Sequence, residues 1–215
     1  MVVLLPWEQV RIGSYYGAEV LLHVISTAIS REILGHYVKA VIMYRSLHHP
    51  NILMFQGAGW STRGEIPMMY VTMIMLTCII VCCSLMATEK TNAGYLHTLI
   101  AGSPYANPSQ APAPMPYATV VDIARDVAAA MSYLHGQCPQ VLHRNLRASS
   151  IHLTHDETRV SGYSAKVASF EWSRRLANDF MTAMQGPAHV APEMMHGGDY
   201  TTAVDVYSFG IRRCI

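Results

Sequence analysis

The sequence is poor in charge. Only 13% of its residues are Asp, Glu, Lys or Arg, whereas an average soluble domain has about 25%. Neither sign dominates, since 15 Lys and Arg stand against 14 Asp and Glu. This balance excludes the basic surface that a nucleic-acid partner requires. Because 51% of the residues are hydrophobic, the composition also excludes a disordered chain.

Cysteine is scarce as well, and it follows no pattern. The five cysteines have neither the pairing of a disulfide framework nor the spacing of a zinc site. The N-terminal residues lack the basic flank of a signal peptide. These absences predict a reduced, cytoplasmic protein. Its 215 residues are enough for one medium domain or two small lobes with a buried core.

One long stretch has no charge at all. It runs from Ile66 to Ala87, which is long enough to cross a membrane as a helix. Tyr70 and Thr77 interrupt it, its flanks carry little positive charge, and Ile79-Ile80-Val81 is equally typical of a buried strand. We expect a strand here, and membrane association through 66–87 is the alternative.

Apolar spacing predicts the main elements. The helical period is clear from Arg31 to Leu47 and from Thr119 to His135, where Thr119 and Asp122 resemble a capping box. A shorter helix is expected over 94–100, and another begins near Ala203. Short apolar runs predict strands at 52–55, 78–83, 141–142, 151–153 and 166–168.

Proline divides the chain into two regions. Five prolines between Gly102 and Pro116 predict a stiff linker. We therefore expect a first region over 7–101, a linker over 102–118 and a second region over 119–215. The apolar residues near 66–77 are expected to be an insertion in the first region.

Four short motifs occur in a fixed order that can be compared with known families. They are His143-Arg144-Asn145-Leu146-Arg147 after the long helix, then Ser169-Phe170-Glu171, Ala191-Pro192-Glu193 and Asp205-Val206-Tyr207-Ser208-Phe209-Gly210. Together with Leu47-His48-His49-Pro50-Asn51-Ile52 upstream, they resemble the protein kinase family in order and spacing from Trp7 onward. The resemblance implies the α+β, two-lobed kinase fold.

Three other segments narrow the resemblance. Trp7-Glu8-Gln9-Val10, the run from Val41 to His49 and the run from Met54 to Ala58 look most like the Raf and kinase-suppressor-of-Ras branch of the tyrosine-kinase-like group.

The resemblance also implies that the chemical groups of a kinase have been replaced. Phosphoryl transfer needs a carboxylate beside the substrate hydroxyl, and it needs carboxylate and amide ligands for magnesium. Asn145 stands at the position of the catalytic aspartate, an amide that cannot accept a proton at neutral pH. Ser150 and Ser169 stand at the two metal-binding positions.

The positions that hold the nucleotide in the family are altered too. His23 takes the place of the phosphate-binding lysine, and Ala40 takes that of its glutamate partner. Leu21 replaces a small alanine and is expected to crowd the adenine pocket. Between Gly13 and Glu19 there is no room for the glycine-rich phosphate hairpin.

Other positions keep the structural residues of the family. By resemblance, His143 and Phe170 belong to its internal hydrophobic spine, with Tyr44 on the helix of the other lobe. Asp205 stands at the buried aspartate that bonds the catalytic-loop backbone. Arg144 is either the partner of a phosphate between Trp172 and Val190, for example on Thr182, or a solvated cation.

A further expectation concerns the completeness of the chain. The surplus apolar residues near 66–77 and the end at Ile215 suggest an imperfect gene model that lacks the last helices of the large lobe. In the family the glutamate matched by Glu193 pairs with an arginine in those helices.

These observations lead to one main interpretation and two alternatives. The main interpretation is a pseudokinase, a catalytically impaired scaffold whose expected partners are a Raf-like kinase and a MAP-kinase kinase. No cofactor is expected, and ATP with magnesium is the only candidate. The alternatives are a weak serine/threonine kinase in which Glu171 binds the metal, and a membrane-anchored kinase-like fragment.

Overall fold

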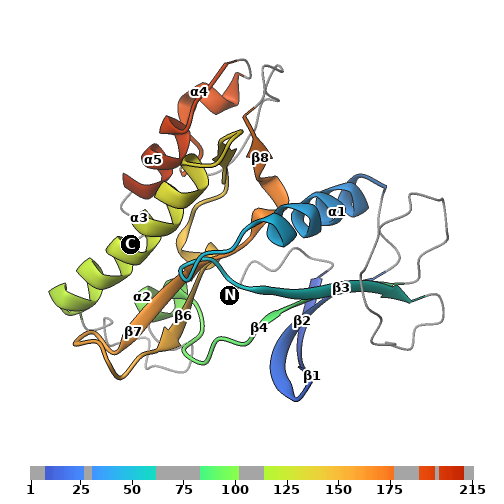
Figure 1. Ribbon diagram of the computed structural model, residues 1–215. Coiled ribbons are helices and arrows are strands. Elements are labelled where there is room, and N and C mark those ends of the chain that lie inside the picture. The colour runs from blue at the N-terminus through green and yellow to red at the C-terminus, as the bar shows by residue number, and fades with distance from the viewer. Residues whose placement is uncertain are drawn as a thin grey trace. The chain divides into compact units, whose positions relative to one another are not determined.

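The computed structural model describes residues 8–26, 31–61, 83–101, 114–176, 189–196 and 199–210 (Figure 1). The chain divides into two compact units, and each is considered by itself. The first contains residues up to His48 together with Leu53–Lys90, and the second contains His49–Ile52 and the residues from Thr91 onward. A four-stranded sheet lies in the first unit, whereas helices and two small two-stranded sheets make up the second. The α+β fold class predicted from the sequence is therefore confirmed.

The first unit is built on an antiparallel sheet with the strand order β1-β2-β4-β3. Its strands are β1 (Glu8–Tyr15), β2 (Ala18–Ser26), β3 (Phe55–Ser61) and β4 (Cys83–Glu89) (Figure 1). Val20 and Leu22 of β2 pack with Ala87 of β4 in a buried cluster. Since alternate residues of a strand point to the same face, this cluster marks the covered face of the sheet.

A two-residue turn joins β1 to β2. Tyr16 and Gly17 both have positive φ, 49° and 81°, as a hairpin with a tight primed turn requires. Tyr15 pairs directly with Ala18. All residues between Gly13 and Glu19 therefore belong to the two paired strands or to their two-residue turn. None is left to form an extended loop.

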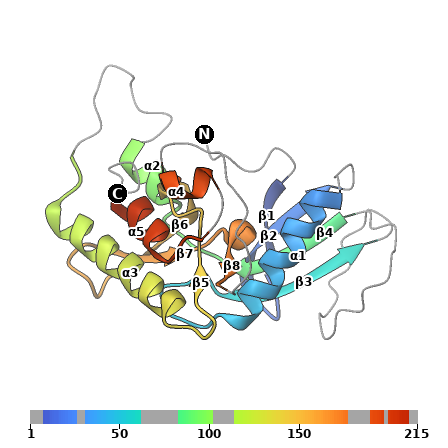
Figure 2. The same ribbon diagram turned by 90° about the horizontal axis from the view of Figure 1, so that it is seen from above.

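Helix α1 (Arg31–Ser46) has the extent that its apolar period predicts. Its buried side carries Tyr37, Ala40, Val41 and Tyr44, and it contacts β3 of the same unit (Figure 2). The spacing of these residues by three and four positions is that of one helix face.

The strand predicted over 52–55 is wrong. Ile52 makes only a single bridge, to Val167 of the second unit, and Asn51 accepts a hydrogen bond from the Val167 amide at 2.8 Å. The Asn51 side chain donates to the Ala165 carbonyl at 3.0 Å. These bonds direct the segment His49–Ile52 into the second unit, so β3 begins only at Phe55.

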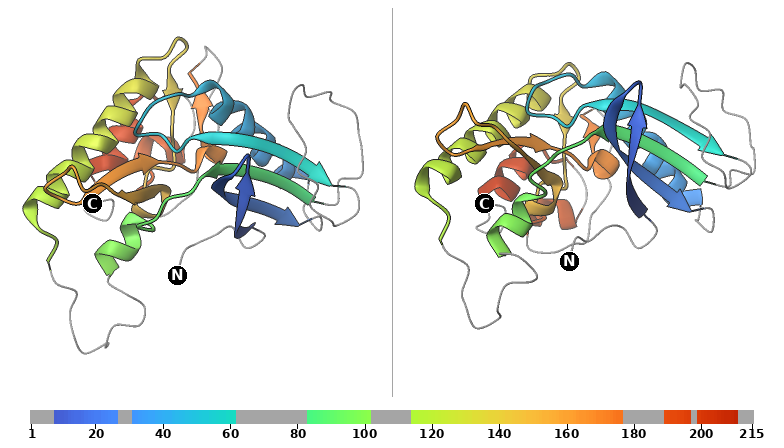
Figure 3. Two further views of the ribbon diagram at one scale, coloured as in Figure 1. Left: turned by 60° about the horizontal axis from the view of Figure 1, so that its bottom comes forward. Right: turned by 90° about the horizontal axis from the view of Figure 1, so that it is seen from below.

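The second unit is organised around α3 (Tyr117–His135), which packs along β7 (Tyr163–Val167) of the hairpin formed with β6 (Ile151–His155) (Figure 3). The strands predicted at 151–153 and 166–168 correspond to β6 and β7, with shifted limits. One side of α3 is buried, as its period predicts, and it includes Ile123, Val127, Ala130 and Leu134.

The predicted start of α3 needs correction. The N-cap residue is Pro116, which has no side-chain oxygen, and Thr119 is buried inside the helix rather than capping it. Asp122 pairs with Arg125 instead of the helix start. The linker predicted over 102–118 therefore overlaps α3 from Tyr117, and residues 102–113 lie outside the described residues.

Smaller elements complete the second unit. Helix α2 (Leu96–Ala101) packs against η1 (Ala148–Ser150), and β5 (Val141–Leu142) pairs with β8 (Arg174–Arg175). The remaining elements are η2 (Phe170–Trp172), α4 (Pro192–Met195) and α5 (Ala203–Gly210). The last two helices share a core with β5, made of Leu142, Val190, Ala191, Met194, Tyr200 and Val204.

The uncharged stretch falls largely outside the described residues, which omit 62–82. The predicted insertion near 66–77 lies there, and so does the predicted strand 78–83 except for Cys83, where β4 begins. Among the residues that are described, no helix has the length and apolar character needed to cross a membrane.

Candidate functional site

The centre of the candidate site is a buried carboxylate, Asp205, in the first turn of α5. Its Oδ2 accepts a hydrogen bond from the His143 amide at 2.9 Å, and its Oδ1 accepts one from the Arg144 amide at 2.8 Å. The ring nitrogen Nε2 of His135, at the end of α3, lies 2.9 Å from Oδ2. Arg144 has a positive φ of 65°, so these bonds hold the loop after β5 in a conformation that an arginine rarely adopts.

His143 links this loop to the segment before η2. Its side chain is fully buried, with Nε2 2.8 Å from the Ala168 carbonyl and Nδ1 3.3 Å from the Asn145 amide. One ring nitrogen therefore donates and the other accepts, which is the pattern of a neutral imidazole. Burial lowers the pKa of His143 and favours this neutral form.

Phe170 is the second fully buried ring of the site. It meets His143 edge-on, with 5.1 Å between the ring centroids. Beside it, the Ser173 hydroxyl donates to the His143 carbonyl at 3.1 Å. The structure thus brings together the motif at His143 and the motif at Phe170, which the sequence separates.

The two predicted metal positions have weak donors. The Ser150 hydroxyl donates to the Arg147 carbonyl at 2.7 Å and accepts from the Arg147 amide at 3.0 Å, so it closes the turn of η1. Ser169 has a left-handed backbone, with φ of 68°, and its side chain makes no capping bond to η2. Magnesium prefers carboxylate oxygens in octahedral geometry, and two serine hydroxyls with the Asn145 amide do not fit that requirement. Within the described ranges, no group of three His, Cys, Asp or Glu side chains is placed to hold a metal ion.

Arg144 is buried, with a relative exposure of 6%. Its guanidinium carbon lies 5.6 Å from the centre of the Tyr200 ring, as in a cation–π contact. Burial lowers the pKa of Arg144. The prediction that this side chain is a solvated cation is therefore wrong, while Thr182, the predicted phosphate carrier, lies outside the described residues. Glu193 is exposed in the first turn of α4.

The remaining predicted residues belong to the first unit. His23 of β2 is buried and shares a hydrogen bond of 3.3 Å with the Thr88 hydroxyl of β4. Ala40 and Tyr44 lie on the buried side of α1, where Tyr44 stacks on Phe55 with 6.4 Å between ring centroids. Leu21 of β2 is half-buried.

Comparison with known families gives a match over nearly the whole chain. Residues 8–213 match the family of protein tyrosine and serine/threonine kinases. The chain belongs to the protein kinase family.

Its relatives are named as protein kinases. A probable serine/threonine-protein kinase of Dictyostelium discoideum is 27% identical over 192 residues, 87% of this chain and 16% of that protein. The dual specificity testis-specific protein kinase 2 of Rattus norvegicus is 27% identical over 185 residues, 84% of this chain and 27% of that protein. The serine/threonine-protein kinase CTR1 of Arabidopsis thaliana is 25% identical over 225 residues, 96% of this chain and 24% of that protein. The chain thus spans between 16% and 27% of the length of these relatives.

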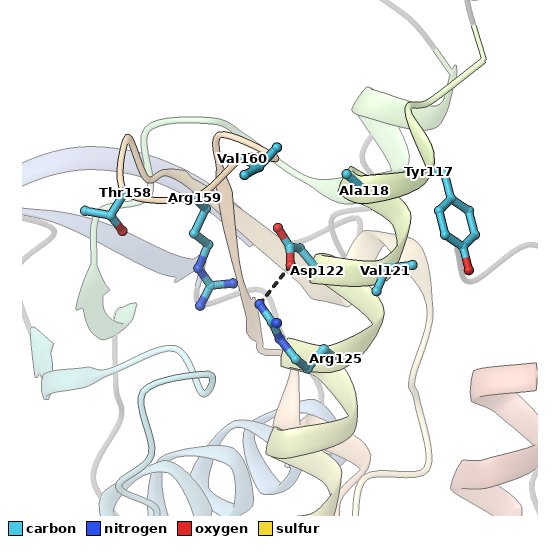
Figure 4. Close-up of a pocket in the computed structure, with 8 residues that line it drawn as sticks. All are labelled: Tyr117, Ala118, Val121, Asp122, Arg125, Thr158, Arg159 and Val160. Carbon is cyan, nitrogen blue, oxygen red and sulfur yellow. Dashed lines mark hydrogen bonds and ion pairs between the residues drawn. The ribbon is translucent and has the colours of Figure 1, made fainter.

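A groove of about 510 Å³ lies elsewhere on the second unit of this kinase domain, between the first turns of α3 and the turn after β6 (Figure 4). The pair Asp122–Arg125, 2.8 Å apart, lies in it. None of the predicted site residues is among those that line it, which are Tyr117, Ala118, Val121, Asp122, Arg125, Thr158, Arg159 and Val160. The groove is therefore separate from the predicted site residues.

Sequence reasoning missed a structural carboxylate beside this groove. Asp126 of α3 accepts a hydrogen bond from the Ala165 amide of β7 at 2.9 Å and another from the Arg159 guanidinium at 2.7 Å. The sequence could have identified Asp126, because this carboxylate lies on the apolar stripe between Ile123 and Val127. A charge on a buried helix face requires hydrogen-bond or ion-pair partners.

Proposed function

We propose that this kinase domain is a pseudokinase of the Raf and kinase-suppressor-of-Ras type. In this proposal the domain does not transfer phosphate. It acts as a scaffold or an allosteric partner in signalling through mitogen-activated protein kinases. The observation that carries the proposal is Asn145, an amide where the family has its catalytic carboxylate, combined with serines at positions 150 and 169.

The chemistry of these residues supports the proposal. An amide cannot take the proton of a substrate hydroxyl, and a neutral hydroxyl lacks the charge that holds magnesium against a triphosphate. Loss of one such group typically costs about 3 kcal/mol of transition-state stabilisation, or a factor of about 100 in rate. When several of these groups are absent from one site, the rate of phosphoryl transfer is expected to be very low.

The retained framework supports a role based on shape. Asp205 bonds two backbone amides of the loop at His143, and His143 packs on Phe170. These contacts keep the loop ordered although its chemical groups have changed. A fold that maintains its packing without its carboxylates is suited to present a surface to a partner.

Thermal-shift titration with ATP tests the proposal, with and without magnesium chloride. We expect no magnesium-dependent shift and no transfer of labelled phosphate to a generic substrate. A variant with Asn145→Asp, Ser150→Asn and Ser169→Asp is the matched control. It restores the catalytic carboxylate and the two metal ligands that the family has at these positions. Magnesium-dependent phosphorylation by the unmodified protein that Asn145→Ala abolishes would overturn the proposal.

The alternative function is a weak serine/threonine kinase. The names of its relatives favour it. In this case Glu171 supplies a carboxylate to the metal, and Glu171→Gln removes the activity while Glu157→Gln, an exposed glutamate in the turn after β6, leaves it unchanged. Absence of activity in the unmodified protein excludes this alternative.

The partners in our proposal are a Raf-like kinase and a MAP-kinase kinase in the cytoplasm. Sedimentation of the purified protein with the kinase domain of each candidate measures these associations directly. We expect a complex with at least one of them, without ATP. Carbonate extraction of cell membranes tests the membrane-anchored alternative, which requires the protein to stay in the pellet.

A further inference from the structure

The groove between the start of α3 and the turn after β6 is bordered by exposed apolar side chains (Figure 4). Tyr117 and Val121 lie one turn apart on α3, with relative exposures of 83% and 42%. Val160 of the turn is almost completely exposed, at 97%. Isolated apolar side chains on a surface need no explanation, but a group of them around a hollow is typical of an interaction site.

A hydrogen-bonded framework holds this groove in shape. Arg159 of the turn donates from Nη1 to the buried Asp126 carboxylate of α3 at 2.7 Å, and its Nε pairs with Asp156 at 3.1 Å. The Gly162 amide donates to the Arg159 carbonyl at 3.0 Å, and the Asp156 amide donates to the Gly162 carbonyl at 2.9 Å. These bonds fix the turn against α3, so the groove exists without a partner. A groove that is formed in advance lowers the cost of binding.

Negative charge predominates around the groove. In residues 117–126 and 156–162 there are four carboxylates and two guanidinium groups, an excess of two negative charges. The carboxylates are Asp122, Asp126, Asp156 and Glu157. Hydrogen bonds from Ser161 and Thr158 lower the pKa values of Asp122 and Asp156, respectively, and favour their ionised forms. This excess of negative charge attracts a basic partner and repels an acidic one.

We propose that this groove is a docking site for a peptide segment of a protein partner, in which a large apolar side chain stands next to lysine or arginine. The apolar side chain enters the groove beside Val121 and Val160, and the basic side chain lies near Glu157. The groove volume of about 510 Å³ is sufficient for such a segment. The site uses none of the replaced kinase residues, so its test and the test of the proposed function can fail independently.

Selection of peptides from a random library displayed on phage, with the purified protein as target, tests the proposal. A variant that combines Val160→Ser with Glu157→Lys is used for counter-selection. It removes one exposed apolar side chain and reverses one exposed charge. We expect the peptides that bind only the unmodified protein to share a large apolar residue beside Lys or Arg. Recovery of no such peptide, or of acidic peptides, overturns the proposal.

The dissociation constant of a recovered peptide, measured by fluorescence anisotropy, separates the apolar contribution from the electrostatic one. Val160→Ser is expected to weaken binding about fivefold to tenfold, because less apolar area is buried. Glu157→Lys is expected to weaken binding about threefold, since it puts a positive charge beside the basic residue of the peptide. The effect of Glu157→Lys is expected to shrink as the salt concentration rises, because salt screens exposed charges.

Val206→Ser and Asp199→Lys are the matched controls, since both positions are exposed and neither lines the groove. Both are expected to leave the affinity for the peptide unchanged. Equal affinities of Val160→Ser and Val206→Ser contradict the proposal. The amide resonances of residues 156–162 in the unmodified protein give a reading that does not depend on any variant. They are expected to shift when the peptide is added, and resonances that stay in place overturn the proposal.

A second copy of this chain is the other possible occupant of the groove. Sedimentation of the protein without peptide measures self-association. A monomer that binds the selected peptide supports the proposal. Self-association that Val160→Ser abolishes, together with a failure of the selection, assigns the groove to dimerisation and overturns the proposal.

Discussion

At the scale of single residues, Asp205 stabilises the loop that carries His143, Arg144 and Asn145. Its two carboxylate oxygens receive bonds from two backbone amides and lie beside the His135 ring. The two bonds from the backbone amides are buried. The two amides need two acceptor oxygens on one side chain, and among the side chains only an ionised carboxylate offers them.

Asp205→Asn is therefore expected to destabilise the second unit by about 1–3 kcal/mol, since one buried amide loses its acceptor. Urea unfolding followed by the fluorescence of Trp172 measures the effect, in a background with Trp7→Phe and Trp60→Phe. Asp199→Asn is the control, because Asp199 is exposed and close in sequence. An equal loss in both variants would contradict this account of Asp205.

The residue types at positions 145, 150 and 169 can be read from the sequence. Asn145 carries an amide and not a carboxylate. The use of the Ser150 hydroxyl within η1 and the burial of Arg144 over Tyr200 could not be read. Both depend on how the loop folds and on a residue far along the chain.

At the scale of elements, Asp126 ties α3 to β7. Both the Ala165 amide and the Arg159 guanidinium donate to the same oxygen, Oδ2, so asparagine keeps one neutral acceptor for them but removes the negative charge that pairs with Arg159. We expect Asp126→Asn to lower the free energy of unfolding by about 1–3 kcal/mol.

Asp122→Asn, one turn earlier on α3, is the control. Asp122 pairs with an exposed arginine, and surface pairs contribute at most about 1 kcal/mol. Chemical denaturation of both variants measures the difference. If Asp122→Asn costs as much as Asp126→Asn, the contact between α3 and β7 does not depend on the buried carboxylate.

Replacing either of two glycines in the first unit by alanine should change the free energy of unfolding, in opposite directions. Gly17 has a φ of 81° in the β1–β2 turn, so Gly17→Ala is expected to cost about 1–2 kcal/mol. Gly35 lies inside α1, and an added Cβ meets nothing within 4 Å. Gly35→Ala is expected to stabilise the unit by about 0.5–1 kcal/mol. Thermal unfolding distinguishes the signs, and a gain at Gly17 would refute the turn geometry.

The helical elements could be predicted from the sequence because α1 and α3 each bury one side, and a period near 3.6 appears directly in the order of residues. The path of residues 52–55, wrongly predicted as a strand, and the start of α3 could not be predicted correctly from the sequence. Short apolar runs carry no period long enough to place them, and at Asn51 the bonds to Ala165 and Val167 decide the path of the chain.

At the scale of the whole molecule, buried histidines should make the protein sensitive to acid. Burial lowers the pKa of His143 below its ordinary value of 6.5. Below that pH the unfolded chain binds a proton that the folded chain does not, so stability falls as the pH falls. The loss is at most about 1.4 kcal/mol per pH unit for one such group.

Unfolding free energies between pH 7.5 and 5.5 test this dependence. His143→Gln is expected to be less stable at neutral pH and to lose less stability on acidification. His155→Gln, at an exposed position, should keep the acid loss of the unmodified protein. An unchanged pH dependence in His143→Gln would mean that other groups cause the acid sensitivity.

The order of the amino acids was enough to predict the kinase family, the α+β class and the amide at position 145. These follow from the kind of residue at each place and from local periodicity, both of which are present in the linear order. Asn145 remains an amide whatever surrounds it.

Which polar groups have hydrogen-bond partners became clear from the folded structure alone. The bond from the His143 amide to Asp205 joins residues 62 positions apart, and the bond from the Ala165 amide to Asp126 joins residues 39 positions apart. Burial and hydrogen bonding are properties of neighbours in space. They arise when distant segments pack together and exclude water, and no local pattern encodes them.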